Sequence, residues 1–287
     1  MKVFADKVAV VTGAGSGIGR ALALRFGRER MRVVLADVES GTLEEAAAEV
    51  RALGVQALAV RTDVSKAADV EALAKKTIDT FGAVHVVCNN AGVAVSGMTW
   101  THTVADWEWV LGVNLWGVIH GVRVFTPLLL AHGDEGHMVN TSSMAGMFSG
   151  PGMSIYNVTK HGVVTLSETL YRELEMLGSR VKVSVLCPGF VNTRILDSNR
   201  NRPADLAETA PPIPGSEEMG IAVRNLLAAG SPPAHVADIV FDAIRAERFY
   251  VFPHPEWKER IEARMNDILA ERNPTLDQVV LNRGVRG

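Results

Sequence analysis

The residues best suited to chemistry are a tyrosine and a lysine four positions apart, Tyr156 and Lys160, in a segment that begins near Ser154. If this segment is helical, side chains at that spacing project from the same face. A phenol with a reference pKa of about 10 is a weak base at neutral pH, but a neighbouring ammonium group favours the phenolate. Such pairs are also common on surface helices, so this pair gains meaning only from the residues around it.

Small and polar residues follow three apolar runs elsewhere in the chain. Ser143, thirteen positions before Tyr156, follows one run, and its hydroxyl could polarise a carbonyl oxygen, although Ser142 is a nearer competitor for that role. Residues 89–92 (Asn-Asn-Ala-Gly) and 188–193 (Pro-Gly-Phe-Val-Asn-Thr) end two further runs. If the runs are parallel strands, all these residues meet at one edge of a sheet.

A glycine-rich turn, residues 12–19 (Thr-Gly-Ala-Gly-Ser-Gly-Ile-Gly), follows the first apolar run. Glycines permit a tight turn and a close approach of the backbone to a pyrophosphate, and the helix that follows presents its N-terminus to the phosphates. The spacing differs from GxGxxG, and a glycine turn alone could be a structural connection. No GK[ST] sequence ends it, which disfavours a nucleoside triphosphate loop.

An acid closes the second apolar run, Asp37, about twenty residues after the glycine turn. A carboxylate there can accept hydrogen bonds from both adenosine ribose hydroxyls and repels a 2′-phosphate. Neither Ser16 nor Val38 supplies the cation that a 2′-phosphate needs. The residues therefore predict NAD in preference to NADP, the alternative being a solvated loop aspartate.

Short apolar runs alternate with stretches of helical period along most of the chain, which predicts repeated βα units. The predicted strands cover residues 8–11, 32–36, 56–61, 84–89, 137–141, 181–186 and 249–252. Strands that are apolar throughout are buried on both faces, so an α/β fold with a parallel sheet between two helical layers is expected.

The composition excludes several other classes of protein. A net charge of −3 offers no attraction to nucleic acid, and neither a signal peptide nor a long uncharged membrane span is expected. Cys88 and Cys187 each end an apolar run, which is typical of buried thiols in a reducing cytoplasm. The histidines and cysteines lack zinc-binding spacing, so no metal site is predicted.

The alternation of apolar runs and helical stretches is interrupted between residues 194 and 233, a proline-rich stretch that we interpret as a substrate lid. Residues 254–287 are expected to form a C-terminal helical extension. An apolar pocket is expected beside the lid, which favours a hydrophobic or aromatic substrate. Its candidate walls are Val93, Val95, Met144, Met153, Phe190 and Ile195. The alternatives are core packing for these side chains and, for Arg194, Arg200 and Arg202, recognition of an anionic substrate tail.

In their order along residues 5–253, these motifs resemble those of the short-chain dehydrogenase/reductase family, single-domain type. The match rests on the glycine turn, Asp37, the Asp63-Val64 pair, residues 89–92, Asn114, Ser143, the Tyr156 and Lys160 pair, and Pro188-Gly189. The resemblance implies a doubly wound Rossmann fold with strand order 3-2-1-4-5-6-7. It also implies a homodimer or homotetramer, for which the helices near residues 106–131 and 154–177 are the expected contact faces.

The resemblance also implies residue roles. Tyr156 would be general base in alcohol oxidation and general acid in ketone reduction, Lys160 would bind the nicotinamide ribose and lower the tyrosine pKa, and Ser143 would orient the substrate oxygen. Asn114 would hold a water that links Lys160 to solvent. The motifs and the resemblance together predict cofactor contacts from Gly13, Ser16, Gly17, Ile18, Gly19, Asp37, Asp63, Val64, Asn90, Ala91, Gly92, Tyr156, Lys160, Pro188, Gly189, Val191 and Thr193.

The expected activity is an NAD-dependent interconversion of a secondary alcohol and a ketone. Two alternatives stay open at this point. One is an NAD-binding sensor or scaffold protein without catalysis, and the other is an epimerase or dehydratase that retains its NAD.

Overall fold

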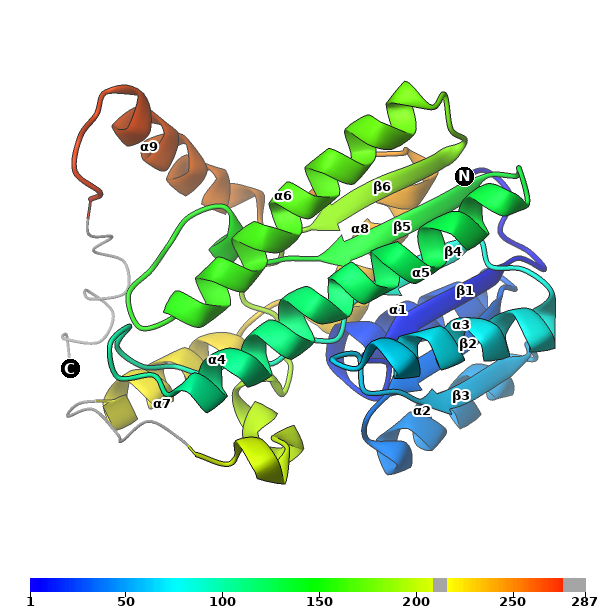
Figure 1. Ribbon diagram of the computed structural model, residues 1–287, viewed down its shortest axis with the longest axis horizontal. Coiled ribbons are helices and arrows are strands. Elements are labelled where there is room, and N and C mark those ends of the chain that lie inside the picture. Colours follow the sequence, from blue (N-terminus) through cyan, green and yellow to red (C-terminus); the bar gives the residue numbers. More distant parts are fainter. Residues whose placement is uncertain (209–215, 276–287) are drawn as a thin grey trace.

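A seven-stranded parallel sheet forms the centre of the computed structural model, which describes residues 1–208 and 216–275 (Figure 1). The order β3-β2-β1-β4-β5-β6-β7 confirms the expected strand order. The strands are β1 Val8–Thr12, β2 Arg32–Asp37, β3 Ala57–Arg61, β4 Val86–Asn89, β5 Gly136–Thr141, β6 Val181–Leu186 and β7 Tyr250–Val251. The order reverses between β1 and β4, so a crevice opens beyond the carboxyl ends of these two strands.

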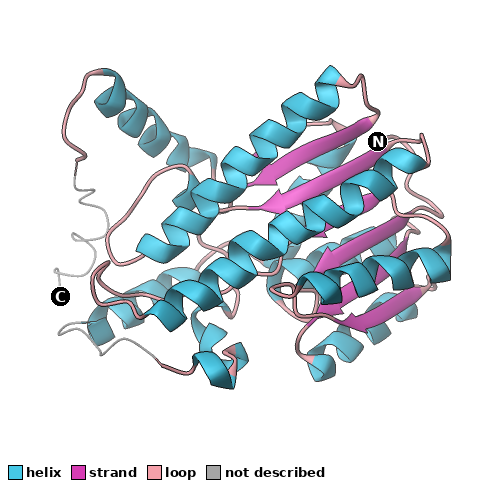
Figure 2. Cartoon of the chain, viewed as in Figure 1, coloured by secondary structure: helices cyan, strands magenta, loops and turns pink. Residues whose placement is uncertain are grey.

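Two helical layers cover the sheet, as the apolar strands predicted (Figure 2). Along β1, Ala9 and Val11 pack into one layer whereas Val8 and Val10 pack into the other, because successive side chains of a strand point to opposite faces. The first layer contains α1 Gly17–Arg28, α2 Ser40–Ala52 and α8 Pro233–Arg245, and the second contains α3 Ala67–Phe81, α5 Gly117–Ala131 and α6 Ser154–Met176. The predicted three-layer α/β fold is therefore confirmed.

Shorter elements surround the carboxyl edge of the sheet. They are α4 Val104–Leu111, a π-helix at Gly112–Trp116, the 3-10 turns Met144–Gly146, Ile195–Asn201, Ala204–Leu206 and Pro255–Trp257, and the helices α7 Ser216–Ala228 and α9 Lys258–Leu269. The stretch interpreted as a lid contains two of these turns and α7, and its residues 209–215 lie outside the described residues, as does the end of the predicted extension, 276–287. Figure 1 shows α9 projecting at the upper left, above the N-terminal half of α6.

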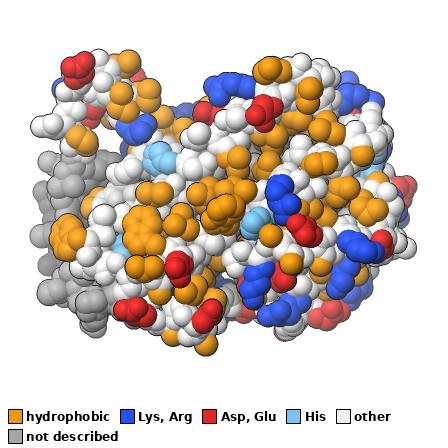
Figure 3. Space-filling model, viewed as in Figure 1, with side chains coloured by type: hydrophobic (Ala, Val, Ile, Leu, Met, Phe, Trp, Pro, Cys, Tyr) orange, Lys and Arg blue, Asp and Glu red, His pale blue; other side chains and the backbone are white. Residues whose placement is uncertain are grey.

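One helical stretch of the described chain, Val104–Ala131, has the length and hydropathy of a membrane span. An 18-residue window within it has a mean hydropathy of 1.3, and 33% of that window is buried. Its inner side contributes Phe125 and Leu129 to the core beneath the sheet. Its outer side is also apolar, since hydrophobic side chains are spread over the face that α5 and α6 present in Figure 3. Exposed examples are Trp116, Leu130 and Val158. Contact between two copies of the chain through this face remains a prediction.

Two histidines in the strands and their approaches are buried as neutral rings. His137 on β5 lies against the Ser184 hydroxyl, 2.7 Å from its Nε2 atom, and Ser184 in turn donates to the carbonyl of Arg248. His85 accepts the Val8 N–H at its Nδ1 atom, 3.2 Å away. Burial lowers the pKa of His137 to about 3 and that of His85 to about 4. At neutral pH both rings are therefore uncharged in the native state.

We expect these histidines to make folding stability depend on pH. In the unfolded chain their pKa is about 6.5, so below that pH the unfolded state binds more protons than the native state and stability falls as the pH falls. Each histidine should lower the free energy of unfolding by roughly 2 kcal/mol between pH 6.5 and pH 5, and the decrease continues to about pH 4 or below. Urea unfolding at several pH values measures this slope, which should be shallower in the His85→Gln and His137→Gln variants. An unchanged slope in both variants would contradict the assignment.

Candidate active site

A cavity of about 400 Å³ lies beyond the carboxyl ends of the central strands and extends from Asp37 to Tyr156. Every residue predicted to contact the cofactor lines it, with the single exception of Gly19, and so does Ser143. Gly19 lies behind the cavity, and only glycine fits there, because a Cβ would lie 2.1 Å from the carbonyl oxygen of Gly13. The cavity is therefore one continuous space that joins the residues expected at its two ends.

The glycine turn forms the floor of the cavity between β1 and α1. Gly13 has φ +65°, and a Cβ there would lie 2.8 Å from the Cα atom of Ala91, so only glycine fits. Beside it, the Thr12 hydroxyl accepts hydrogen bonds from the backbone N–H groups of Asn90 and Ala91, at 2.9 and 3.1 Å. The Asn90 amide donates back to the Thr12 carbonyl at 3.0 Å. Thr12 thus joins the turn to the Asn-Asn-Ala-Gly loop, a role that no sequence pattern had indicated.

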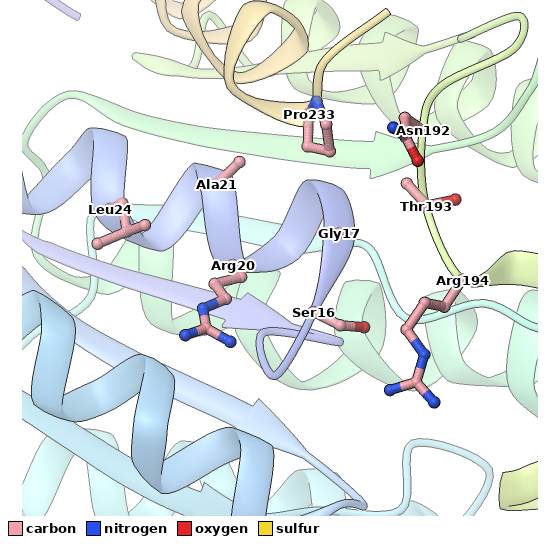
Figure 4. A pocket seen from close by; sticks show the side chains of 9 residues that line it. All are labelled: Ser16, Gly17, Arg20, Ala21, Leu24, Asn192, Thr193, Arg194 and Pro233. Atoms are coloured by element: carbon pink, nitrogen blue, oxygen red, sulfur yellow. The ribbon is translucent and has the colours of Figure 1, made fainter. Parts of the chain in front are cut away.

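A smaller pocket of about 330 Å³ lies on the outer side of the same turn (Figure 4). Ser16 and the first two turns of α1 form one wall. Asn192 to Arg194, which follow β6, form the other together with Pro233. Arg20 is paired with Glu49 at 2.7 Å. Because Ser16, Gly17, Thr193 and Arg194 line both spaces, this pocket is an outward continuation of the cavity.

Asp37 stands at the end of β2, where its carboxylate is held by the backbone. One oxygen accepts the Gly15 N–H at 2.9 Å and the other accepts the Glu39 N–H at 3.0 Å. These bonds fix the carboxylate at the mouth of the cavity beside the glycine turn. The geometry suits an acceptor for two neighbouring hydroxyl groups of a ribose.

Glu39 closes the same end of the cavity through contacts that sequence reasoning missed. Its Oε1 atom accepts from Arg200 Nε at 2.9 Å and from Asn201 Nδ2 at 2.7 Å, so the 3-10 turn Ile195–Asn201 is bound to the residues after β2. Burial raises the pKa of Glu39, but the hydrogen bonds from Asn201 and Arg200 outweigh it and the net shift is downward. The partners are 161 residues apart, and no local signal could have found them.

The three arginines considered for an anionic substrate tail each have a carboxylate within reach. Arg200 pairs with Glu39, and Arg194 lies 3.9 Å from Asp197. Arg202 is buried 2.7 Å from Asp106 at the start of α4, with its guanidinium carbon 5.1 Å from the centre of the Trp109 ring. These pairs hold the segment that follows β6 against α4 and against the end of β2.

At the other end of the cavity, Tyr156 and Lys160 project from the first turns of α6. The Lys160 Nζ atom lies 5.4 Å from the centre of the Tyr156 ring and donates to the carbonyl of Thr141, at the end of β5, at 2.9 Å. Lys160 is only 3% exposed. The helical spacing thus places both groups beside the end of β5, as the sequence predicted.

The two serines after β5 have different roles. The Ser142 hydroxyl is buried and donates to the carbonyl of Lys160 at 2.8 Å, so it holds α6 against the sheet. The Ser143 hydroxyl accepts the Ala145 N–H at 3.1 Å, lies 3.4 Å from the Pro188 carbonyl and hydrogen-bonds to Tyr156. Of the two candidates, Ser143 therefore lies beside the phenol.

Alanine substitutions at the two serines should separate these roles. We expect Ser143→Ala to lower kcat by roughly 10- to 100-fold with little change in stability, because a hydroxyl beside the reacting oxygen is lost. Ser142→Ala should instead reduce the free energy of unfolding by about 1 kcal/mol or more, because the buried carbonyl of Lys160 loses its donor. Steady-state kinetics and urea unfolding of both variants test this, and equal kinetic losses in the two would contradict the distinction.

Asn114 lies in the π-helix between α4 and α5 and is fully buried. Its amide accepts the Val93 N–H at 2.8 Å and donates to the Val93 carbonyl at 2.9 Å, and it lies 3.4 Å from the Thr159 hydroxyl on α6. A π-turn adds one residue to the helical ring and often marks a functional site. Here it turns the Asn114 amide towards the loop after β4 and towards α6, next to Lys160.

Burial controls the pKa values of the two central groups. It raises the pKa of Tyr156 to about 12, although the hydrogen bond from Ser143 acts in the opposite direction. It lowers the pKa of Lys160 to about 8. Desolvation is therefore the larger effect on the phenol, and the lowering of its pKa by Lys160, which the family resemblance implies, stays a prediction.

The candidate walls of the substrate pocket are found in several places. Val93 and Ile195 line the cavity, and Val95 packs in a cluster with Val93 and Trp109. Met153 is the residue before α6 and pairs with Gly97 through a β-bridge, and Phe190 contacts Trp257 edge-on at 5.2 Å. Met144 is 1% exposed and lies in the core with Val118 and Val163, so it does not line the cavity.

No group of three or more His, Cys, Asp and Glu side chains is arranged for a metal ion within residues 1–208 and 216–275. Cys88 and Cys187 are free, buried thiols, and burial raises the pKa of both. Neither thiol is therefore poised as a nucleophile at neutral pH.

Comparisons with known proteins show which family this chain belongs to. A solved short-chain dehydrogenase/reductase from Burkholderia phymatum in complex with NAD is 45% identical, has a TM-score of 0.94, and is matched over 96% of this chain and 99% of that one. The 1-deoxy-11-beta-hydroxypentalenate dehydrogenase of Streptomyces arenae is 35% identical over 91% of this chain and 87% of its own length. The C alpha-dehydrogenase of Sphingobium sp. is 31% identical over 94% and 87%. The sequence profile of the short chain dehydrogenase family matches residues 7–204, and the chain therefore belongs to this family of oxidoreductases.

Proposed function

We propose that this protein is an NAD(H)-dependent dehydrogenase that interconverts a secondary alcohol and a ketone on an apolar substrate, with Tyr156 as general acid and base. One observation carries the proposal. The Tyr156 phenol, with the Ser143 hydroxyl beside it, lines the same continuous cavity as Asp37 and the glycine turn. A dinucleotide that extends from Asp37 to Tyr156 would bring its nicotinamide, which accepts or donates the hydride, to the reacting carbon.

Asp37 and the glycine turn are suited to hold the adenosine half. The Asp37 carboxylate is already oriented by the Gly15 and Glu39 N–H groups, and the turn at Gly13 lets the backbone approach a pyrophosphate. A 2′-phosphate would meet this carboxylate, and Arg200, one of the cations that line the cavity, is paired with Glu39. These contacts support NAD over NADP, and the similar Burkholderia phymatum structure is a complex with NAD.

In ketone reduction Tyr156 would act as the acid. Because the pKa of Tyr156 is about 12, its phenol carries a proton at neutral pH and can donate it to the carbonyl oxygen as negative charge develops there. Ser143 would donate a hydrogen bond to the same oxygen and orient it. In alcohol oxidation the same phenol must first lose its proton, a step that alkaline pH and nearby positive charge both favour.

Lys160 would hold the nicotinamide ribose. Its ammonium has three donors, and Thr141 uses one of them. Asn114 would help to hold Lys160 in place, because its amide joins the Val93 backbone to Thr159 on the same helix as Lys160. A positive charge on Lys160 also favours the phenolate during oxidation, although burial lowers the pKa of Lys160 to about 8.

Apolar side chains of the cavity support a hydrophobic substrate. Val93, Trp109, Val113 and Ile195 line the cavity. Arg200 and Arg202 of the neighbouring segment pair with Glu39 and Asp106, so neither offers a free site for an anionic substrate tail. Two similar proteins carry names of dehydrogenases, one of them for a hydroxypentalenate.

A substrate panel tests the proposal. NADH absorbance would be followed while purified protein is offered aromatic and alicyclic secondary alcohols with NAD, and the matching ketones with NADH, beside sugar alcohols and short hydroxy acids. We expect turnover of apolar members and a kcat/KM at least tenfold higher for them than for polar ones. Turnover of polar members alone would overturn the substrate class. Bound NAD that does not exchange, together with no net turnover, would instead point to an epimerase or dehydratase.

A further inference from the structure

His254 lies just after β7, behind the loop that follows β6, and is 9% exposed. Its Nδ1 atom accepts the backbone N–H of Gly189 at 3.0 Å, and its Nε2 atom lies 3.1 Å from the Ser231 hydroxyl. An imidazole nitrogen that accepts a hydrogen bond carries no proton. The ring is therefore the tautomer with its proton on Nε2, which can donate to Ser231.

The ring and the loop also fit together by shape. A Cβ at Gly189 would lie 3.0 Å from His254 Cγ, so the imidazole packs directly on the glycine Cα and a side chain at position 189 is excluded. Ser231 adds two backbone bonds, donating to the Phe190 carbonyl and accepting the Asn192 N–H, each at 3.0 Å. Residues 188–193 are thus held by His254 and Ser231, which belong to two segments distant in the sequence.

The opposite side of this loop is the cavity wall near Tyr156. Pro188, Gly189, Val191 and Thr193 line the cavity together with Tyr156. The Pro188 carbonyl accepts the Met144 N–H at 2.9 Å and lies 3.4 Å from the Ser143 hydroxyl. A shift of the Gly189 peptide would therefore move the wall against which the reacting end of a dinucleotide must rest.

We propose that His254 is a positioning residue for the nicotinamide half of the cofactor, acting by holding the Gly189 N–H and with it the Pro188-Gly189 wall. The proposal rests on the proposed dinucleotide function. It adds a residue outside the matched family segment, 7–204, and gives the start of the C-terminal segment a role in the cofactor site.

The charge state of His254 agrees with this role. Burial is the largest effect and lowers the pKa of His254. Glu256 in the turn Pro255–Trp257 and a hydrogen bond to the Phe190 backbone act in the opposite direction, and His235 on α8 adds a smaller lowering. The ring is thus neutral at neutral pH, as an acceptor must be. Below the lowered pKa a proton on Nδ1 would displace the Gly189 N–H, so acid should weaken this support.

Two substitutions separate the acceptor from the bulk of the ring. His254→Phe keeps an aromatic ring without an acceptor, whereas His254→Asn offers an amide oxygen close to the position of Nδ1. Dissociation constants for NADH, measured by its fluorescence, and for ADP-ribose, measured by calorimetry, report on the whole dinucleotide and on the half without nicotinamide. His235→Asn, which removes an exposed histidine on α8, is the matched control at neutral pH.

We expect His254→Phe to weaken NADH roughly tenfold, the effect of leaving a buried N–H without its acceptor, and to change ADP-ribose by less than about twofold. His254→Asn should restore NADH binding to within about threefold of the wild type, without the weakening at acid pH. Equal loss of both ligands in His254→Phe with no rescue by asparagine, or no loss of NADH at all, overturns the proposal. If His254→Phe does not fold, unimpaired NADH binding by His254→Ala would overturn it. Wild-type protein that binds neither ligand would overturn the proposed function itself, whereas an empty substrate panel leaves these binding results unaffected.

Discussion

Replacing Tyr156 with phenylalanine is expected to lower kcat/KM by roughly 10²- to 10⁴-fold in both directions, the usual contribution of a general acid or base. The variant loses the one hydroxyl that can exchange a proton with the substrate oxygen, and Ser143 remains to orient that oxygen. Steady-state kinetics on the best substrate of the panel measures the loss. The NADH dissociation constant should change by less than about twofold, because the other predicted cofactor contacts, including Asp37, the glycine turn and Lys160, stay in place.

The pH dependence of the wild-type enzyme completes this test. Since burial raises the pKa of Tyr156 to about 12, the protonated form dominates below that pH, and reduction, which needs the acid, should not be limited by loss of this proton near neutrality. Oxidation needs the phenolate and should therefore rise with pH through the alkaline range. A Tyr156→Phe enzyme with full activity, or an oxidation rate that falls as the pH rises above 7, would refute the assignment of Tyr156.

Replacing Asp37 with asparagine is expected to lower kcat/KM for NAD by roughly 10- to 100-fold, because charge-assisted hydrogen bonds to the ribose are lost. The substitution also removes the negative charge that would repel a 2′-phosphate, so the ratio of kcat/KM for NADP to that for NAD should rise. One carboxylate oxygen of Asp37 accepts the Gly15 N–H and the other accepts the Glu39 N–H, whereas an amide has only one acceptor oxygen. One of these two loop hydrogen bonds is therefore lost in the variant, and its loss accounts for part of the lower kcat/KM.

Kinetics with both cofactors at saturating substrate measures this change. Asp79→Asn is the matched control, because Asp79 lies exposed on α3 and pairs only with Lys75 at 2.5 Å, far from the cavity residues. The control should leave both cofactor constants unchanged. If the wild-type enzyme prefers NADP, or if Asp37→Asn leaves the ratio unaltered, Asp37 does not select the cofactor.

The sequence-based predictions matched the structure best where a feature depends on interactions between residues close together in the chain. Apolar runs of β-branched residues alternated with helical periods, and each run became a strand near its expected position. The spacing of Tyr156 and Lys160 placed them on one helix face, since four residues make about one helical turn. Buried parallel strands and their helical crossovers require two covering layers, so the architecture followed from the same pattern.

The site was harder to predict from the sequence where two candidate residues were adjacent in the chain or where hydrogen-bond partners lay far apart along it. Ser142 and Ser143 differ by one position, and only their surroundings separate them, since one hydroxyl meets the Lys160 carbonyl and the other meets Tyr156. Met144 was expected at the pocket and lies in the core, because the turn after β5 directs it inward.

By itself the sequence determined the βα order, the glycine turn between β1 and α1 and the shared helix face of Tyr156 and Lys160, because each depends on residues within a few turns of chain. Tertiary structure alone decided which serine lies beside the phenol, that burial raises the pKa of Tyr156, and that His254 holds the loop at Gly189. Desolvation and long-range hydrogen bonds arise only when distant segments pack together, and no spacing along the chain encodes them.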